Sequence, residues 1–341
     1  MPSVPMSEAS LLGAPLLEVP LLQVRGLTVE YETAAGPVRA VESFDLDVRR
    51  GEFVGVVGES GCGKSTMLFG VAQLLSPPAR VSAGSVVFNG RDLVTMNAKQ
   101  LAATRWRDLS VVMQSAMNAL NPVKQLAAQY EDVMRAHGEK SREVIRRRSE
   151  EVLRLVGIDK EHLSSYPHQL SGGMRQRAMI AMALLFTPDL VIMDEPTSAL
   201  DVVAQRSLMV QIKELQQELG FAVVFVTHDM SLVSHFSDRL VVMYAAKAAE
   251  IGPTREVFAH PGHPYTQGLL DAFPSVRGPK VPLTGIPGSP PNLLHPPTGC
   301  RFAARCPHRF ELCDTPPDLY DTGHTLAACH LHSPMRKEAV R

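Results

Sequence analysis

The chain has 341 residues, which is enough for one large domain or two modest domains with substantial cores. Its 34 basic residues are balanced by 35 acidic ones, so its bulk charge does not indicate a nucleic-acid or acidic-membrane partner. No apolar run reaches the roughly 20 residues of a bilayer-spanning helix, so we expect that the chain itself does not cross a membrane.

Residues 1–20 are expected to form a flexible leader, not a signal peptide. The stretch is rich in leucine, but it has no basic start, and Pro15 and Pro20 interrupt it. A secretory signal needs a basic segment followed by a continuous apolar run.

Two short β segments are expected next. Leu22–Val29 alternates apolar and polar residues, and Val38–Val48 follows a Gly-Pro turn, which is the pattern of an antiparallel pair. Tyr31 lies in this region, and its ring could stack on an adenine base. The same position fits an ordinary exposed strand tyrosine equally well, so the pattern alone leaves both interpretations open.

The most informative stretch is Val54–Thr66. An apolar, mostly β-branched segment leads into residues 58–65, GESGCGKS, which fit the phosphate-loop pattern GxxxxGK[ST], and an apolar helix follows. Glycines allow the tight turn, and the backbone N–H groups and the positive helix end bind polyphosphate. Lys64 is expected to reach the β- and γ-phosphates and Ser65 to hold Mg²⁺. The candidate contacts are Gly58, Ser60, Gly61, Cys62, Gly63, Lys64, Ser65 and Thr66.

The middle of the chain predicts a short strand followed by a helical region. Leu109–Met113 is apolar and ends at Gln114, and Leu126–Val156 has helical periodicity with an apolar stripe. A basic run at residues 146–148 is interleaved with acidic residues at helical spacing. We therefore expect a solvated helix face and no nucleic-acid contact there.

A second helix start suited to anions occurs at Leu170–Arg177, LSGGMRQR. Ser171 precedes Gly172 and Gly173 and opens an apolar helix, so its hydroxyl and the following N–H groups could bind phosphate. One phosphate chain rarely needs two such sites. The pattern therefore predicts a dimer, in which a second subunit completes the site.

Carboxylates end the next expected core strand, Leu190–Met193. Ligands of open α/β sheets bind at the carboxyl ends of the strands. Asp194 suits Mg²⁺, and Glu195 suits the polarisation of an attacking water.

A helix over Val202–Leu219 and a buried strand over Ala222–Val226 are expected after these carboxylates. Asp201 ends the turn before this helix, and His228 follows the strand. His228 could contact a γ-phosphate, although a single histidine after a strand is more often structural.

In this order, the motifs resemble those of the nucleotide-binding subunit of an ATP-binding cassette (ABC) transporter, over roughly Leu21–Pro274. The signature Leu170–Met174 separates this family from kinases, helicases and small GTPases, which also have phosphate loops. The resemblance implies an α/β fold with a RecA-like P-loop core, an antiparallel β subdomain and a helical subdomain inserted at about residues 115–170. The matching motifs are the Walker A loop Gly58–Ser65, the Q-loop Gln114, the signature, Walker B Leu190–Asp194 with Glu195, the D-loop Ser198–Asp201 and the switch His228.

The resemblance also implies a role for each of these residues. Tyr31 would stack on adenine, Gln114 would contact Mg²⁺ and sense the transmembrane partner, Glu195 would be the catalytic base, and His228 would hold the γ-phosphate. Two nucleotides would lie between two such subunits. Each Walker A loop would then face the other subunit's signature, with Ser171, Gly172, Gly173 and Asp201 counted among the nucleotide-binding residues. Met174 stands where the family generally has Gln, a form common in peptide-importer subunits.

The tail resembles that of the dipeptide/oligopeptide and nickel importer subfamily. The similar runs are Ile251-Gly252-Pro253, His263-Pro264-Tyr265-Thr266 and Leu269-Leu270, followed by a Pro-rich connector and by Gly299-Cys300-Arg301-Phe302 and Arg305-Cys306-Pro307. Residues 275–341 are expected to form this connector and a small Cys-rich C-terminal domain. One departure is the run 245–250, AAKAAE, which lacks the subfamily's glycine turn, so the hairpin there is expected to be altered.

Four cysteines of this tail are Cys300, Cys306, Cys313 and Cys329. A cytosolic nucleotide-binding protein keeps thiols reduced, so metal binding is favoured over disulfides. Their wide spacing lacks the paired C-x2-C knuckles of zinc ribbons. The resemblance favours a 4Fe-4S cluster over zinc, and unligated thiols remain a third interpretation.

The function implied is that of an ATP-hydrolysing subunit that drives import of di- and oligopeptides. The expected partners are two transmembrane permease subunits, a second ABC ATPase subunit that is identical or a paralogue, and an extracytoplasmic solute-binding protein. The chain would lie peripherally on the cytoplasmic face of the membrane. Import of nickel or another solute stays open, as does a redox-sensing role for the cysteines. A soluble cassette acting on DNA or ribosomes is the competing class, but such chains typically carry a long coiled coil or two cassettes, and this chain has neither.

Overall fold

A computed structural model describes residues 19–114, 119–198, 200–272 and 285–335. Outside these ranges lie residues 1–18 of the expected leader, residues 115–118 of the expected helical subdomain, Ala199 of the D-loop and residues 273–274 of the expected ATPase domain. Residues 275–284 and 336–341 of the expected C-terminal region also lie outside them. Within the described ranges, no helix combines the length and the apolar character that a membrane span requires.

The first sheet is the antiparallel subdomain that the sequence predicts. Strand β1 buries apolar residues such as Leu22, Val24 and Leu27. It pairs antiparallel with both β2 and β4, in the strand order β2-β1-β4-β5. The strands are β1 (Leu22–Thr33), β2 (Gly36–Val48), β4 (Ala79–Phe88) and β5 (Arg91–Asp92).

The second sheet forms the core of the fold and has the order β11-β12-β10-β9-β3-β8-β7-β6. From β9 to β6 the strands are parallel, and β3, β7 and β8 are buried along their whole length, as expected for strands covered on both faces. Their carboxyl ends therefore meet at one edge. The strands are β3 (Phe53–Val57), β6 (Leu109–Val112), β7 (Leu190–Asp194), β8 (Ala222–Val226), β9 (Arg239–Tyr244), β10 (Lys247–Pro253), β11 (Tyr320–Asp321) and β12 (Leu326–Ala327).

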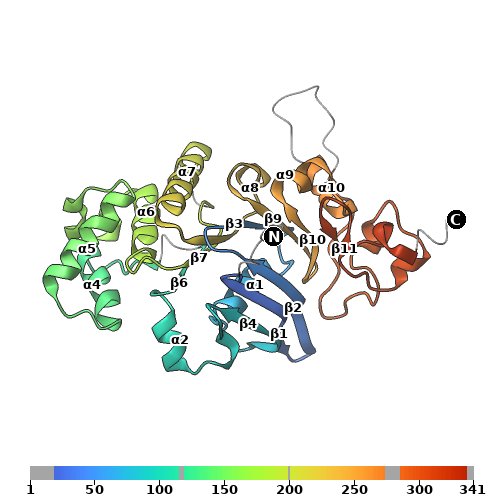
Figure 1. The fold of residues 1–341 in the computed structure, drawn as a ribbon, viewed down its shortest axis with the longest axis horizontal. Helices are drawn as coiled ribbons and strands as arrows, with labels where there is room; N and C mark the ends of the chain where they lie inside the picture. Colours follow the sequence, from blue (N-terminus) through green and yellow to red (C-terminus); the bar gives the residue numbers. More distant parts are fainter. Residues whose placement is uncertain (1–18, 115–118, 199, 273–284, 336–341) are drawn as a thin grey trace, which may run out of the picture.

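Helices α4, α5 and α6 lie together at one end of the molecule, far from the C-terminal residues at the other end (Figure 1). Their apolar stripes share one core with the parallel strands. The predicted helix over Val202–Leu219 is confirmed as α7, and Gly220 ends it at a φ of 75°. The α-helices are α1 (Lys64–Val71), α2 (Ala98–Thr104), α4 (Leu126–Ala136), α5 (Arg142–Leu155), α6 (Gly172–Ala183), α7 (Val202–Leu219), α8 (Met230–Phe236), α9 (Thr254–Ala259) and α10 (Pro264–Asp271).

The hairpin between β9 and β10 forms despite its lack of glycine. Its two-residue turn consists of Ala245 and Ala246, with φ values of 45° and 73°. Both residues are buried, and the Ala246 N–H donates to the Cys62 carbonyl at 3.0 Å. Buried contacts thus hold two alanines in a conformation that glycine or asparagine usually adopts, and the pairing of β9 with β10 shifts register between Ala248 and Glu250. That this hairpin differs from the subfamily's stays a prediction.

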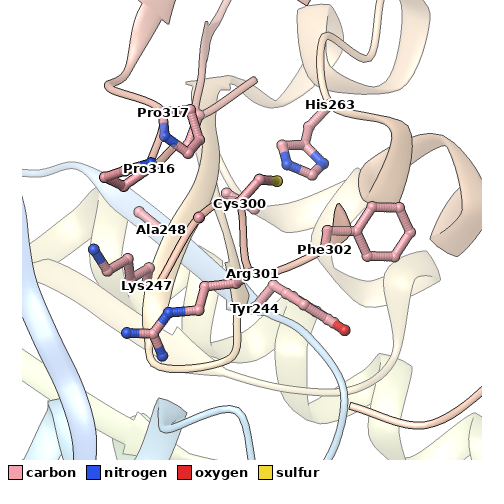
Figure 2. A pocket seen from close by; sticks show the side chains of 12 residues that line it. Tyr244, Lys247, Ala248, His263, Cys300, Arg301, Phe302, Pro316 and Pro317 are labelled. Atoms are coloured by element: carbon pink, nitrogen blue, oxygen red, sulfur yellow. The ribbon is translucent and has the colours of Figure 1, made fainter. Parts of the chain in front are cut away.

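Residues 285–335, here called the C-terminal segment, pack directly on the ATPase core. Strand β12 pairs antiparallel with β10, so the segment extends the central sheet. Cys300, Phe302 and Cys313 belong to the same apolar cluster as the parallel strands. Figure 2 shows Cys300 with His263 and Phe302 around a small cavity of about 40 Å³ between the segment and β10. The limits of a separate C-terminal domain stay a prediction. Short 3-10 helices complete the fold: Leu93–Thr95, Lys160–Ser164, Pro167–Gln169, Ala303–Arg305, Glu311–Asp314 and His330–His332.

Candidate nucleotide-binding site

A cavity of about 470 Å³ lies at the edge where the parallel strands end. The loop after β3 supplies one wall, and single residues after β6, β7 and β8 supply the other. Residues predicted from motifs far apart in the chain therefore meet in one place. The lining residues are Ala40, Ser60, Gly61, Gly63, Lys64, Ser65, Thr66, Gln114, Glu195 and His228.

Lys64 is the cation at the base of this cavity. Its side chain is buried, and its Nζ donates to the carbonyls of Gly58 at 2.8 Å and Glu59 at 3.0 Å. Gly63, with a φ of 104°, precedes Lys64 and begins helix α1, whose first N–H groups face the loop. A buried ammonium beside free helix N–H groups is an anion-binding arrangement.

Ser65, which lines the cavity, contacts Asp194, a buried residue just behind the lining. The Ser65 hydroxyl donates to Asp194 Oδ1 at 2.9 Å. Burial raises the pKa of Asp194, and the neighbouring Glu195 charge adds to this effect, while the Ser65 hydrogen bond opposes it. A hydroxyl beside a poorly solvated carboxylate is a donor set that suits Mg²⁺.

Glu195 is held from two sides at the rim. Gln114 Nε2 donates to Glu195 Oε2 at 2.6 Å, and His228 Nδ1 lies 3.4 Å from Glu195 Oε1. The backbone of Glu195 has a φ of 45°, and its N–H donates to the Val226 carbonyl at 2.9 Å. A non-glycine residue in this region of backbone space is strained, and such strain is common at functional sites.

The remaining predicted residues lie elsewhere. The Tyr31 hydroxyl is 3.2 Å from Thr66 Oγ1, beside the loop. Ser171 begins α6 and accepts a hydrogen bond from the Met174 N–H at 3.2 Å, and a Cβ at Gly173 would meet open space. Of the residues that the structure describes, Ser171, Gly172, Gly173 and Asp201 do not line this cavity. Their part in nucleotide binding stays a prediction.

Two family models match the chain. The one described as "ABC transporter" covers residues 41–198, and the one described as "Oligopeptide/dipeptide transporter, C-terminal region" covers residues 249–313. The dipeptide transport ATP-binding protein DppD of Bacillus subtilis is 43% identical over 297 residues, which is 86% of this chain and 89% of that protein. The oligopeptide transport ATP-binding protein OppD of Salmonella typhimurium is 41% identical, over 88% of this chain and 90% of that protein.

The chain belongs to the ABC transporter family. A solved cassette, MJ0796 in a dimeric post-hydrolysis state bound to ADP and Pi, has a similar fold, with a TM-score of 0.62 and 28% identity over 69% of this chain and 99% of that one. The ABC fold and its ATP hydrolysis coupled to transport, both predicted from the motifs, are thereby confirmed.

Replacement of Asp194 by Asn in this ABC ATPase is expected to stabilise the nucleotide-free protein and to remove its response to Mg²⁺. Because the pKa of Asp194 is raised in the folded state, ionisation of this carboxyl costs stability as the pH rises through that pKa. Asn stays neutral and still accepts the Ser65 hydrogen bond, but it is a weaker Mg²⁺ ligand.

We expect a higher melting temperature for Asp194→Asn near pH 7, with a difference that narrows as the pH falls. The additional stabilisation that Mg²⁺ gives with ATP should be lost. Scanning calorimetry over a pH series, with ATP alone and with MgATP, measures both effects. A lower melting temperature at pH 7, or an unchanged Mg²⁺ effect, would contradict this account of the Asp194 site.

The sequence did not predict two contacts of the ABC phosphate loop. The Arg305 guanidinium pairs with the Glu59 carboxylate, and the Tyr265 hydroxyl accepts a hydrogen bond from the Glu59 N–H at 2.9 Å. Both partners lie in runs that the sequence marks only as parts of the tail pattern. The one sequence feature that could have indicated such a contact is Glu59. An acidic side chain inside an anion-binding loop needs a cation close by.

Proposed function

We propose that this protein powers the import of di- and oligopeptides. One observation carries the proposal. Along this chain, a region that matches the ABC transporter family is followed by a region that matches the C-terminal region of oligopeptide/dipeptide transporters. The relatives, which are named as dipeptide and oligopeptide transport ATP-binding proteins, support it. ATP binding would close two cassettes on each other, hydrolysis would reopen them, and the motion would be passed to partner permeases.

Within the cavity, each residue has a proposed task. Lys64 and the loop N–H groups bind the phosphates, and Ser65, Asp194 and Gln114 hold Mg²⁺. Glu195 accepts a proton from the attacking water, and His228, which is largely exposed beside it, contacts the γ-phosphate. The contacts of Glu195 with Gln114 and His228 support this assignment, because all three side chains line the same cavity as Lys64 and Ser65.

The proposed partners complete what one chain lacks. Ser171, which is exposed, and Gly173, where a Cβ would meet open space, suit contact with the nucleotide of a second ABC ATPase subunit, identical or a paralogue. Two permease subunits would form the pathway, and an extracytoplasmic binding protein would deliver the peptide. We place the chain peripherally on the cytoplasmic face, where ATP is supplied.

Co-purification tests this assembly. A tagged copy of the protein is isolated from membranes in mild detergent, and its partners are identified by mass spectrometry. We expect two permease subunits in stoichiometric amounts. Association with ribosomal or DNA-bound proteins that resists high salt would overturn the proposal.

We further propose that the four tail cysteines hold a 4Fe-4S cluster. Cys300, Cys313 and Cys329 are buried, and Cys306 is partly buried. Burial, together with the charge of the other three cysteines, raises the pKa of Cys329 to about 11. Four thiolates whose charges act on one another in this way would repel one another unless a bound cationic group balanced their charge.

The spacing of the cysteines along the chain supports a cluster over a single zinc ion. Cys300, Cys306, Cys313 and Cys329 lack the paired C-x2-C knuckles of zinc ribbons. A four-iron cluster keeps its ligands further apart, because each thiolate binds a different iron. When bound, such a group would supply cross-links that stabilise the C-terminal segment.

Protein purified without oxygen is expected to contain iron and sulfide in about equal amounts and to absorb light at about 400 nm. Cys313→Ser should lose most of the iron and should lower the melting temperature. Cys62→Ser is the matched control, since Cys62 lies in the phosphate loop, and it should keep the iron. Stoichiometric zinc, or full iron content in Cys313→Ser, would contradict the proposal.

A further inference from the structure

Glu59 is an acidic residue at the second position of a loop that binds polyphosphate. Its carboxylate lies in the same turn as the carbonyls that receive Lys64, and its side chain is 25% exposed. A negative charge here would repel the phosphates of a nucleotide and would cost free energy where it is partly desolvated. The loop therefore needs a cation that balances Glu59 without competing for the phosphate position of Lys64.

Arg305 of the C-terminal segment provides that cation. Its Nη1 and Nη2 atoms lie 2.7 Å and 2.9 Å from the two Glu59 oxygens, which is a bidentate pair. Nη1 also donates to the Tyr244 hydroxyl, and Nε and Nη2 donate to the carbonyls of Pro287 and Ile286. All five N–H groups thus have acceptors, and the side chain is only 6% exposed. An arginine bound in this way is fixed in place and cannot turn toward a nucleotide.

The backbone of Glu59 is held by neighbouring elements as well. Its N–H donates to the hydroxyl of Tyr265, which is buried in α10. His263 begins that helix by accepting a hydrogen bond from the Tyr265 N–H, and burial lowers the pKa of His263 to about 4, so the ring stays neutral. The first turn of the phosphate loop is therefore supported by residues that follow all the motifs of the ATP site in the chain.

We propose that Arg305 is a positioning residue of the ATP site, which neutralises Glu59 and fixes the first turn of the phosphate loop from the C-terminal segment. Tight ATP binding then depends on this segment, although none of its described residues lines the 470 Å³ cavity. The inference rests on ATP binding by the cassette and is independent of which solute is transported.

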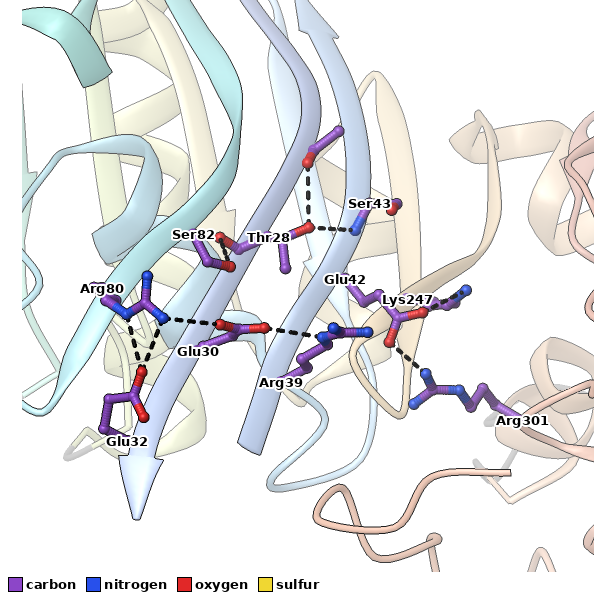
Figure 3. A network of polar contacts seen from close by, with 11 residues as sticks. Thr28, Glu30, Glu32, Arg39, Glu42, Ser43, Arg80, Ser82, Lys247 and Arg301 are labelled. Carbon is purple, nitrogen blue, oxygen red and sulfur yellow. Dashed lines mark hydrogen bonds and ion pairs between the residues drawn. The ribbon is translucent and has the colours of Figure 1, made fainter. Parts of the chain in front are cut away.

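A second arginine of the segment provides a matched control. Arg301 Nη2 pairs with Glu42 Oε2 at 2.5 Å on β2, and Lys247 pairs with the other Glu42 oxygen at 3.0 Å (Figure 3), while Arg301 Nη1 donates to the Ala245 carbonyl at 3.2 Å. Removal of Arg301 leaves Glu42 with Lys247 as a partner, whereas removal of Arg305 leaves Glu59 without its bidentate cation. Both changes break an ion pair between the C-terminal segment and the body of the protein, but only Arg305→Gln removes the cation from a carboxylate inside the loop.

The test measures MgATP dissociation constants by calorimetry for Arg305→Gln, Arg301→Gln and the double variant Arg305→Gln with Glu59→Gln, in the full-length protein. We expect Arg305→Gln to bind MgATP about tenfold more weakly, because a partly buried carboxylate loses its cation. Arg301→Gln should stay within about twofold of the wild type, because Glu42 lies outside the loop and keeps Lys247 as its partner. The double variant should recover most of the affinity, since the repelling charge is gone.

A structural role alone would give a different pattern. If Arg305→Gln bound MgATP as well as Arg301→Gln does, or if the double variant were as weak as Arg305→Gln, the proposal would be overturned. The loss should also be greater for ATP than for ADP, because the repulsion grows with phosphate charge; equal losses would contradict it. Should Arg305→Gln not fold, the double variant and Arg305→Lys carry the same test, with Arg305→Lys weaker than the wild type by a few fold because it cannot pair at both oxygens.

Discussion

Replacement of Glu195 by Gln is expected to lower the rate of ATP hydrolysis by about 10²- to 10⁴-fold, because the attacking water loses its base. ATP binding should change little. The amide oxygen of the substituted side chain can still accept the hydrogen bond that Gln114 donates to Glu195 at 2.6 Å, and the phosphate loop with Lys64 is untouched. The loss should therefore appear in kcat and not in the dissociation constant for ATP.

Steady-state phosphate release and equilibrium ATP binding measure the two quantities separately. Glu218→Gln, the same substitution at an exposed position of α7, is the control and should behave as wild type. Hydrolysis by Glu195→Gln at near wild-type rates would remove Glu195 from the role of base. A large loss of ATP binding would instead make the residue part of the binding site.

Gly63→Ala is expected to destabilise the protein by at least about 3 kcal/mol and to abolish ATP binding. Gly63 has a φ of 104°, and an added Cβ would lie 2.0 Å from the backbone oxygen of Ala40. Relief of this clash requires the backbone of β2 or the start of α1, which carries Lys64, to move. The loop should then lose the geometry that brings its N–H groups together.

Gly61→Ala is the matched control. Gly61 also has a positive φ, of 77°, but a Cβ there would meet nothing within 4 Å. Gly61→Ala should lower the free energy of unfolding by only about 1–2 kcal/mol, as expected for an alanine in the left-handed backbone conformation. Urea denaturation of both variants, together with ATP titration, separates steric clash from backbone strain. Equal losses of stability in the two variants would show that the clash with Ala40 is relieved by relaxation.

The parts of this fold that the sequence predicts are those governed by short-range patterns. The phosphate loop, helix α7 with Gly220 at its end, and the buried strands β7 and β8 all follow from residues close to one another in the chain. The convergence of Gln114, Glu195 and His228 was also predictable, because parallel strands place their carboxyl ends at one edge.

Other features depend on contacts between distant residues. Arg305 and Glu59 are 246 positions apart, and no local pattern specifies their pairing. Strands β11 and β12 have only two residues each, too few for a periodic signal, and they form because β10 offers a free edge. The Ala245-Ala246 turn contradicts local preference, and it is held by packing around the phosphate loop.

The most direct test of the central claim is ATP hydrolysis by the complete transporter in proteoliposomes. The protein is reconstituted with its co-purified permeases, and a binding protein is added with or without a dipeptide. We predict that peptide-loaded binding protein stimulates hydrolysis and drives peptide accumulation, and that Glu195→Gln abolishes both. Hydrolysis that is unaffected by the peptide, with no accumulation under conditions where the ATPase is active, would contradict the assignment as a peptide-import ATPase.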